Sequence, residues 1–302
     1  MKAISRKIVY HTVVVVHLLV LVGCDTTEEK QGGETLFRGN ARIACDREII
    51  ELIGPQIEWF IARHSEARVR LDTSSADEAM RQLLSGNVRA AFIARDYLPQ
   101  EDSLLRAYNV EQHKRFLIAT DAVVFVVRGS SSFDTISQAT LIRTLRGERT
   151  PLANLQWIVP DVTSSITAYL STVVGPRLRI RGYVVPSGDS VLHTIARGEG
   201  DIGIALLSQL QRKKKLLSLR PIRVVIQDST TGDRVAIMPH VATIVKERYP
   251  FRVPIYGYLF ESARNFPYGV VASLAFEAKP QRAMLDAGIV PAYAKLQLVE
   301  QE

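Results

Sequence analysis

Residues 116–127 (FLIATDAVVFVV) form a long, mostly apolar run in the middle of the chain. A run of this length, rich in β-branched residues, is typical of a buried strand. We expect it to cross the molecule and to link two parts of it. On either side, short apolar runs alternate with segments of helical spacing, and this alternation is typical of an α/β architecture.

Two sets of elements flank this strand, and each repeats the order strand, polar turn, helix. The first set has expected strands at 41–45, 68–71 and 90–94, and Gly54-Pro55 is expected to kink or restart its first helix. The second set has expected strands at 156–159, 183–185 and 202–206. We expect residues 224–227 and 235–241 to return the chain to the first set, followed by a strand at 255–260 and a helical segment at 268–285. Two similarly built lobes are therefore predicted.

The composition supports a globular protein. Of 302 residues, 47% are hydrophobic, with 18 Gly and only 2 Cys, which excludes disordered, collagen-like and disulfide-framework chains. At roughly 100 to 200 residues per domain, the length suggests two domains. The net charge is +7, but Lys2, Arg6 and Lys7 account for 3 of it, so +7 − 3 leaves +4 for the rest. This mild excess does not require a nucleic-acid partner.

The first 23 residues have the pattern of an export signal. Three basic residues precede the uncharged run 8–22, which is shorter than the roughly 20 residues that span a bilayer. The run ends in Leu21-Val22-Gly23-Cys24, which resembles the lipobox of bacterial lipoproteins. The resemblance implies cleavage before Cys24 and acylation of its sulfur and new amino group. The alternative is an ordinary signal anchor that ends in cysteine.

Residues 24–36 are expected to be a flexible tether, because most of them are polar and several are acidic or Gly. Asp25, directly after the lipid site, resembles the inner-membrane retention signal of some Gram-negative lipoproteins. If Cys24 carries lipid, Cys45 is the remaining thiol and no intramolecular disulfide can form. We expect a small buried thiol at Cys45 rather than a reactive one.

Three polar turns follow expected strands and open expected helices. Helix N-termini have unpaired backbone N–H groups and the positive end of the helix dipole, so turns that converge can bind an oxyanion. Each turn alone is better explained as a helix N-cap, because Ser, Thr and Asp are the preferred capping residues. Their distribution over both lobes favours a cleft that holds an anion. The turns are Asp46-Arg47-Glu48, Thr73-Ser74-Ser75 and Thr163-Ser164-Ser165.

Arg95 ends the third expected strand. In an open α/β sheet, ligands bind beside the carboxyl ends of the strands. A guanidinium there can hold a tetrahedral oxyanion through two parallel hydrogen bonds. The alternative is a solvated arginine paired with Asp96.

Eight stretches, in order and covering nearly all of the chain after Leu36, resemble the phosphate-type solute-binding proteins of ABC importers. They are ACDRE (44–48), LLSGNVR (83–89), IAR (93–95), IATDAVV (118–124), TLRG (144–147), GDIGI (200–204), YPFR (249–252) and DAGIVPA (286–292). The resemblance implies the type II periplasmic-binding-protein fold, with two α/β lobes, two crossover strands and a ligand cleft between the lobes. It implies lobe 1 at 37–122 plus 240–302 and lobe 2 at 123–239.

The resemblance also implies the phosphate-binding positions of the first lobe and of the second. Asp46 lies at the first strand-to-helix turn, Ser74 and Ser75 at the second, and Ser164 and Ser165 in the Ser-Gly-Thr turn of the second lobe. Three positions depart from the family: Ile166 replaces the threonine, Pro160 a phosphate-clamping arginine, and Arg95 an acidic residue. The charges are exchanged, so Arg95 would supply the missing charge and Asp46 would accept the phosphate proton.

Other chemistry finds little support. The six histidines are scattered, and there is no HExxH, CxxC, GxSxG or glycine-rich phosphate loop, so we expect no metal, no cofactor and no catalysis. The basic run 212–215 lacks interleaved aromatic residues and is expected on a solvated helix face, although a contact with lipid headgroups or a partner is also open.

We therefore expect a monomeric, lipid-anchored protein on the periplasmic side of the cell envelope, at the inner membrane. It would capture inorganic phosphate, or a related tetrahedral oxyanion, for an ABC permease. Two alternatives remain: a sensor or scaffold lipoprotein that kept the fold and lost the ligand, and a phosphatase that uses the same anion pocket.

Overall fold

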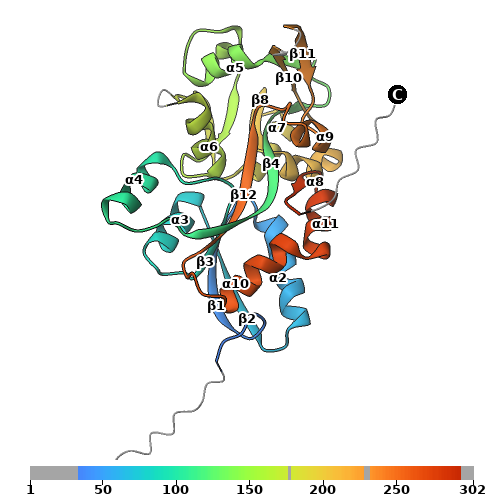
Figure 1. Ribbon diagram of the computed structural model, residues 1–302. Coiled ribbons are helices and arrows are strands. Elements are labelled where there is room, and N and C mark those ends of the chain that lie inside the picture. The colour runs from blue at the N-terminus through green and yellow to red at the C-terminus, as the bar shows by residue number, and fades with distance from the viewer. Residues whose placement is uncertain (1–32, 176–177, 228–231, 294–302) are drawn as a thin grey trace, which may run out of the picture. The chain divides into compact units, whose positions relative to one another are not determined.

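The computed structural model describes residues 33–175, 178–227 and 232–293 (Figure 1). The predicted export signal, the lipid site Cys24 and most of the predicted tether lie outside these ranges. Contacts group the described residues from Glu34 onward into one compact unit. In the described ranges, no helix combines the length and the apolar character needed to cross a bilayer.

One large mixed sheet organises this unit, and β4 (Lys114–Arg128) is its central strand. The strand order is β2-β1-β3-β12-β4-β8-β6-β7, and two short strands, β13 (Val290–Pro291) and β9 (Leu219–Pro221), also pair with β4. The other strands of this order are β1 (Gly39–Asp46), β2 (Ala67–Ser74), β3 (Ala90–Ile93), β12 (Arg252–Leu259), β8 (Ile202–Leu206), β6 (Trp157–Pro160) and β7 (Tyr183–Val185). The predicted α/β class is confirmed.

The strand β4 pairs with different partners along its length, as the apolar run predicted. Residues 114–122 pair with β12, residues 123–126 with β8, and residues 126–128 with β9, all antiparallel. We call β2, β1, β3, β12 and the first part of β4 the first half-sheet, and the second part of β4, β8, β6 and β7 the second half-sheet. β4 thus crosses between them. The division into two lobes at residues 122 and 239 stays a prediction.

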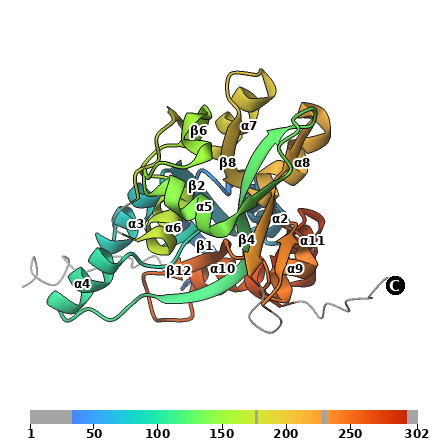
Figure 2. The ribbon, with the colours of Figure 1, turned by 90° about the horizontal axis from the view of Figure 1, so that it is seen from above.

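Helices cover both faces of the large sheet. In both views, α3, α4 and α6 lie on one side of β4, and α2, α9 and α11 lie on the other (Figures 1 and 2). The helices are α2 (Ile50–Arg63), α3 (Ala76–Leu84), α4 (Pro99–Ala107), α5 (Gln138–Leu145), α6 (Ser165–Val174), α7 (Gly188–Ala196), α8 (Leu207–Leu217), α9 (Val241–Val245), α10 (Phe266–Phe276) and α11 (Ala278–Asp286), with a 3₁₀ turn at Pro151–Asn154. The basic run 212–215 lies on α8, so the predicted helix is confirmed. Its face is not fully solvated, because the side chains of Arg212 and Lys213 are only 24% and 19% exposed and contact Glu51 and Asp189.

Alternation along β1 shows why this strand needs helices on both faces. Ile43 and Cys45 belong to the larger core cluster with α2 and α10, whereas Ala44 belongs to a smaller cluster with Met80 of α3. Successive side chains of a strand point to opposite faces, and here both faces are buried. Because both faces are covered, successive residues at the end of β1 are all buried, and the sequence there does not alternate between apolar and polar residues.

Three expectations need correction. The residues expected to return the chain to the first lobe instead form a separate sheet: β10 (Arg223–Gln227) pairs with β11 (Arg234–Ile237) and with β5 (Thr135–Ser137). The chain re-enters the large sheet through β12. The helical pattern 268–285 forms two helices, α10 and α11, that meet at Glu277. Finally, α2 does not restart at Pro55: it is one helix from Ile50 to Arg63 with this proline inside it. A kink at Gly54-Pro55 stays a prediction.

The close packing around β12 gives the first testable prediction. A Cβ on Gly257 would lie 2.5 Å from Val271 Cγ1 and 3.1 Å from Phe92 Cε1. We expect Gly257→Ala to lower the free energy of unfolding by about 1 to 3 kcal/mol, the usual cost of overpacking a core. Urea unfolding followed by circular dichroism measures this change.

The matched control is Gly54→Ala in α2, where a Cβ would meet no atom within 4 Å. Replacing a helical glycine by alanine is expected to stabilise by about 0.5 to 1 kcal/mol. Equal unfolding midpoints for the two variants would contradict the packing described for β12.

Candidate functional site

The parallel pairing of the first half-sheet brings its strand ends together. Asp46 at the end of β1 pairs in register with Ser74 at the end of β2. β3 also runs parallel to β1, and the amide of Ala94, directly after β3, donates to Asp46 Oδ2 at 3.3 Å. Strand carboxyl ends therefore form one edge, as the sequence predicted.

Two of the predicted polar turns cap helices. The Ser75 hydroxyl accepts from the Glu78 amide at 3.3 Å and opens α3, and the Ser164 hydroxyl accepts from the Thr167 amide at 3.2 Å and opens α6. The Ser74 hydroxyl donates to the Ser75 carbonyl at 3.2 Å. The capping interpretation of these two turns is thus confirmed. The N-termini of α3 and α6 lie at the edge formed by the carboxyl ends of the strands.

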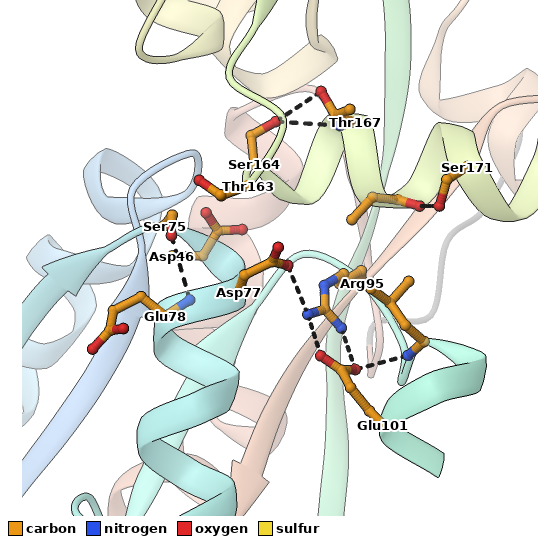
Figure 3. Close-up of polar contacts among 12 residues, drawn as sticks. Asp46, Ser75, Asp77, Glu78, Arg95, Glu101, Thr163, Ser164, Thr167 and Ser171 are labelled. Atoms are coloured by element: carbon orange, nitrogen blue, oxygen red, sulfur yellow. Dashed lines mark hydrogen bonds and ion pairs between the residues drawn. The ribbon is translucent and has the colours of Figure 1, made fainter. Parts of the chain in front are cut away.

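The turns of the two half-sheets meet. The Asp77 amide in the first turn of α3 donates to the Thr163 carbonyl, just before α6, at 3.3 Å. Figure 3 shows Asp46 beside Ser75 and below the turn that carries Thr163 and Ser164. The buried Ser165 hydroxyl lies close enough to Asp46 to favour its ionised form. Two helix N-termini from different half-sheets therefore converge around Asp46.

Asp46 itself is fully buried. Its Oδ1 accepts from the Glu48 amide at 3.1 Å and its Oδ2 from the Ala94 amide. Burial raises its pKa, and the hydroxyl of Ser165, these amides and the charge of Arg95 only partly offset that rise. The carboxyl thus occupies amide donors that would otherwise face a bound oxyanion.

The surroundings of Arg95 differ from the expected solvated pair with Asp96, and its phosphate-binding role stays a prediction. Arg95 is buried, with a side chain only 2% exposed, and its guanidinium bonds Glu101 at 2.7 and 2.8 Å and Asp77 at 3.2 Å (Figure 3). Asp96 pairs with Arg115 instead, so the solvated Arg95–Asp96 pair is wrong. Burial alone would lower the pKa of Arg95, but the two carboxylates raise it, so the guanidinium stays charged and is already balanced.

Two acidic groups border the same place. Burial raises the pKa of Asp77, although Arg95 opposes this rise. Asp161 keeps a lowered pKa because the hydroxyl and amide of Thr163 donate to it at 2.7 and 2.8 Å. The site therefore combines helix N-termini with carboxyl groups, and its one buried guanidinium is held by two of them.

The two departures in the second half-sheet carry no charge to the site. Pro160 ends β6, and its carbonyl accepts from the Thr167 hydroxyl at 3.3 Å. Ile166 is fully buried in the hydrophobic core. From this side, the site is formed by the turn 163–165 and by the N-terminus of α6.

A further contact between the half-sheets involves Glu48, which the sequence placed in a polar turn without assigning it a role. Its Oε2 accepts from the Gly188 amide at 2.9 Å and from Gln209 Nε2 at 2.8 Å. Burial, followed by the nearby Asp46 carboxylate, raises the pKa of Glu48 to about 8. The sequence shows that the motif Asp46-Arg47-Glu48 is charged. It does not show the partners of Glu48, which lie 140 and 161 residues further along the chain.

The thiol beside Asp46, that of Cys45, is buried. Burial, together with the charge of Asp46, raises the pKa of Cys45 well above its usual value, so the thiol stays protonated. Across the described ranges, no group of three or more His, Cys, Asp or Glu side chains could hold a metal ion. The arrangement can hold an anion or exchange protons, and it offers no activated nucleophile.

Comparison with solved structures places the fold. A proposed phosphate ABC transporter substrate-binding protein with bound phosphate from Clostridium perfringens superposes with a TM-score of 0.68 at 10% identity, over 84% of this chain and 99% of that one. An ABC-type phosphate transport receptor from Vibrio cholerae gives 0.63 at 13% identity, over 83% and 99%. PstS from Borrelia burgdorferi gives 0.54 at 15% identity, over 84% and 99%.

At these identities the likeness concerns the fold. A comparison with curated proteins found no match. The profile of a family described as a PBP superfamily domain, however, matches residues 28–275, which is well over half of the chain. The half-sheets joined through β4, the converging strand ends and this match lead to one conclusion: the chain belongs to the PBP superfamily domain family of periplasmic binding proteins.

Proposed function

We propose that this protein captures inorganic phosphate, or a related tetrahedral oxyanion, between its two half-sheets and delivers it to an ABC permease. The observation that carries the proposal is the convergence of two helix N-termini, those of α3 and α6, at the Asp77–Thr163 contact beside Asp46. Backbone amides and the dipoles of helices stabilise an anion at such a place. The structural neighbours that transport phosphate support the same ligand.

The residues proposed to bind phosphate have distinct roles. Ser74, Ser75, Ser164 and Ser165, with the amides of the helix N-termini, would donate hydrogen bonds, and Arg95 would supply charge. Asp46 would accept the proton of a protonated phosphate, which distinguishes it from sulfate. Two lobes, 37–122 plus 240–302 and 123–239, would close about a hinge, driven by contacts that only the closed form provides. The family is one of solute-binding proteins, and no bond is broken in this function.

We also propose a cellular location for the protein. Cleavage before Cys24 and acylation of Cys24 would hold a monomer to the inner membrane, on its periplasmic side. Residues 24–36 would form a flexible tether between the lipid anchor and the folded unit. Metabolic labelling with a fatty acid, compared between the full chain and Cys24→Ala, tests the anchor: loss of label is expected in the variant.

A second candidate is a sensor or scaffold that no longer binds phosphate. The specific observation in its favour is that Arg95 is already balanced by Glu101 and Asp77, while Asp46 accepts the amides of Glu48 and Ala94. Internal carboxylates thus occupy donors that a ligand needs. Calorimetry of the full chain with phosphate, arsenate and sulfate separates the candidates: heat with phosphate supports capture, whereas no heat with any of them supports the sensor.

The competition for Arg95 can be relieved by mutation. In Asp77→Asn, the 3.2 Å ion pair with Arg95 is lost while the bonds to Glu101 remain. A guanidinium with a free side can donate a charge-assisted hydrogen bond to phosphate, so we expect phosphate affinity to rise by about threefold to tenfold. Isothermal titration calorimetry measures it.

The control for this change is Asp102→Asn, which removes an acid paired with Arg106 on α4, an exposed pair of the same chain. Its phosphate affinity should match that of the unmodified chain. Weaker binding in Asp77→Asn would show that Asp77 supports the ligand rather than competing with it.

The proposed role of Asp46 predicts that replacing it weakens the selectivity for phosphate over sulfate. In Asp46→Asn, the side chain keeps a carbonyl oxygen for one amide but can no longer take a proton from phosphate. We expect the preference for phosphate over sulfate to fall by at least about tenfold, equivalent to roughly 1.4 kcal/mol. Competition titrations with the two anions give the ratio, and an unchanged ratio would remove Asp46 from the discriminating role.

A further inference from the structure

Glu48 connects the two half-sheets through its carboxyl group. It lies in the turn between β1 and α2, and its Oε2 accepts from the amide of Gly188, the first residue of α7, at 2.9 Å. Gln209 of α8 donates from Nε2 both to this oxygen at 2.8 Å and to the Glu48 carbonyl at 3.1 Å. One side chain of the first half-sheet thus binds two helices packed on the second.

Gln209 is itself fixed for this contact. Its Oε1 accepts from the Leu206 amide at 2.9 Å, so its Nε2 must face Glu48. Gly188 has no room for a side chain, because a Cβ there would lie 2.2 Å from Gln209 Oε1. The receiving surface is therefore shaped around the Glu48 carboxyl.

The charges around Glu48 do not balance an ionised carboxylate. Asp46 at the end of β1 and Asp189 on α7 are both acidic and both disfavour a second negative charge. The nearby cations of α8 are engaged elsewhere: Lys213 bonds Asp189 at 2.9 Å and contacts Glu51 of α2 at 3.8 Å, and Arg212 contacts Glu51 at 3.2 Å.

The other oxygen of Glu48 shows the same imbalance. The side chain is 1% exposed, and Oε1 has no hydrogen-bond partner among the described residues. A buried carboxylate without a cation is costly, and two adjacent buried carboxyls cannot readily both be ionised. A neutral Glu48, or one proton held by the Asp46–Glu48 pair, removes that cost.

From this geometry we infer that Glu48 is a positioning residue that joins the two half-sheets on uptake of one proton. When the halves separate, Glu48 becomes solvated and releases the proton. The inference rests on the proposed hinge closure. It does not require that phosphate is the ligand.

The direction of the pH effect follows from linkage. In the closed form the pKa of Glu48 is raised to about 8, and a solvated glutamate returns to about 4.5. The stabilisation of the closed form is complete below the lower pKa, declines as the pH rises between the two, and is lost above about 8. Within this window the ratio of closed to open form falls by up to about tenfold per pH unit.

The experiment measures the distance between the half-sheets without phosphate. Spin labels on Arg81→Cys of α3 and Thr172→Cys of α6, two exposed positions, report it in the full chain carrying Cys24→Ser. Pulsed electron paramagnetic resonance from pH 5 to pH 9 should show a growing population of longer distances. In Glu48→Gln, which mimics the protonated acid, the short distance should persist across the series.

The matched control is Glu58→Gln, an exposed glutamate of the same helix α2, which should follow the unmodified chain. A distance that does not change with pH in the unmodified chain overturns the inference, whether or not the variants fold. A Glu48→Gln variant that opens like the control overturns it as well. If opening follows pH but calorimetry shows no heat with phosphate, the proton-linked contact stands and the proposed ligand fails.

Discussion

The continuity of β4 is the constraint on which the rest of the structure depends. One strand of 15 residues bonds β12 through its first part and β8 through its second part. Because every hydrogen bond of this ladder must be satisfied in a buried environment, the relative register of the two half-sheets is fixed at their junction. The polar turns can meet only because this register aims both sets of strand ends at the same place.

The junction is also where buried polar groups accumulate. Asp121, within β4, is fully buried and accepts from its neighbour Ala122 at 2.7 Å and from Ser208 of α8 at 3.2 Å. Burial raises its pKa to about 6. Asp46, Glu48 and Asp121 thus place three buried acidic side chains at the boundary between the half-sheets. Such groups add little to stability and require exact partners, so they specify one arrangement of the halves rather than many.

Much of the fold was predictable from local patterns. The residues of β4 and β8 were predicted to within two residues, because long apolar runs indicate buried strands. The start of α6 was predicted from its capping turn. The pairing of β10 with β11 and β5 was not, because an apolar run of four or five residues does not reveal which sheet it joins. Long-range pairing is decided by tertiary packing, which a short segment does not record.

The candidate site was predictable in position but not in electrostatics. Asp46, Ser75 and Ser164 come together because strand ends of an α/β sheet share an edge. The partners of Arg95 could not be read from the sequence, since Asp77 and Glu101 are separated from it by a strand and by a turn. The sequence suggested Asp96 as the ion-pair partner because it is adjacent. In the structure its carbonyl accepts from Arg95 Nη1 at 3.0 Å, while its carboxylate pairs with Arg115.

The in-register pairing of Asp46 with Ser74 has a consequence for redesign. The position of the site is fixed by strand pairing and by the starts of helices, while its charge comes from side chains of the turns. Side chains of the turns can therefore be exchanged without rebuilding the frame. The same frame could therefore be redesigned for anions of other charge and size.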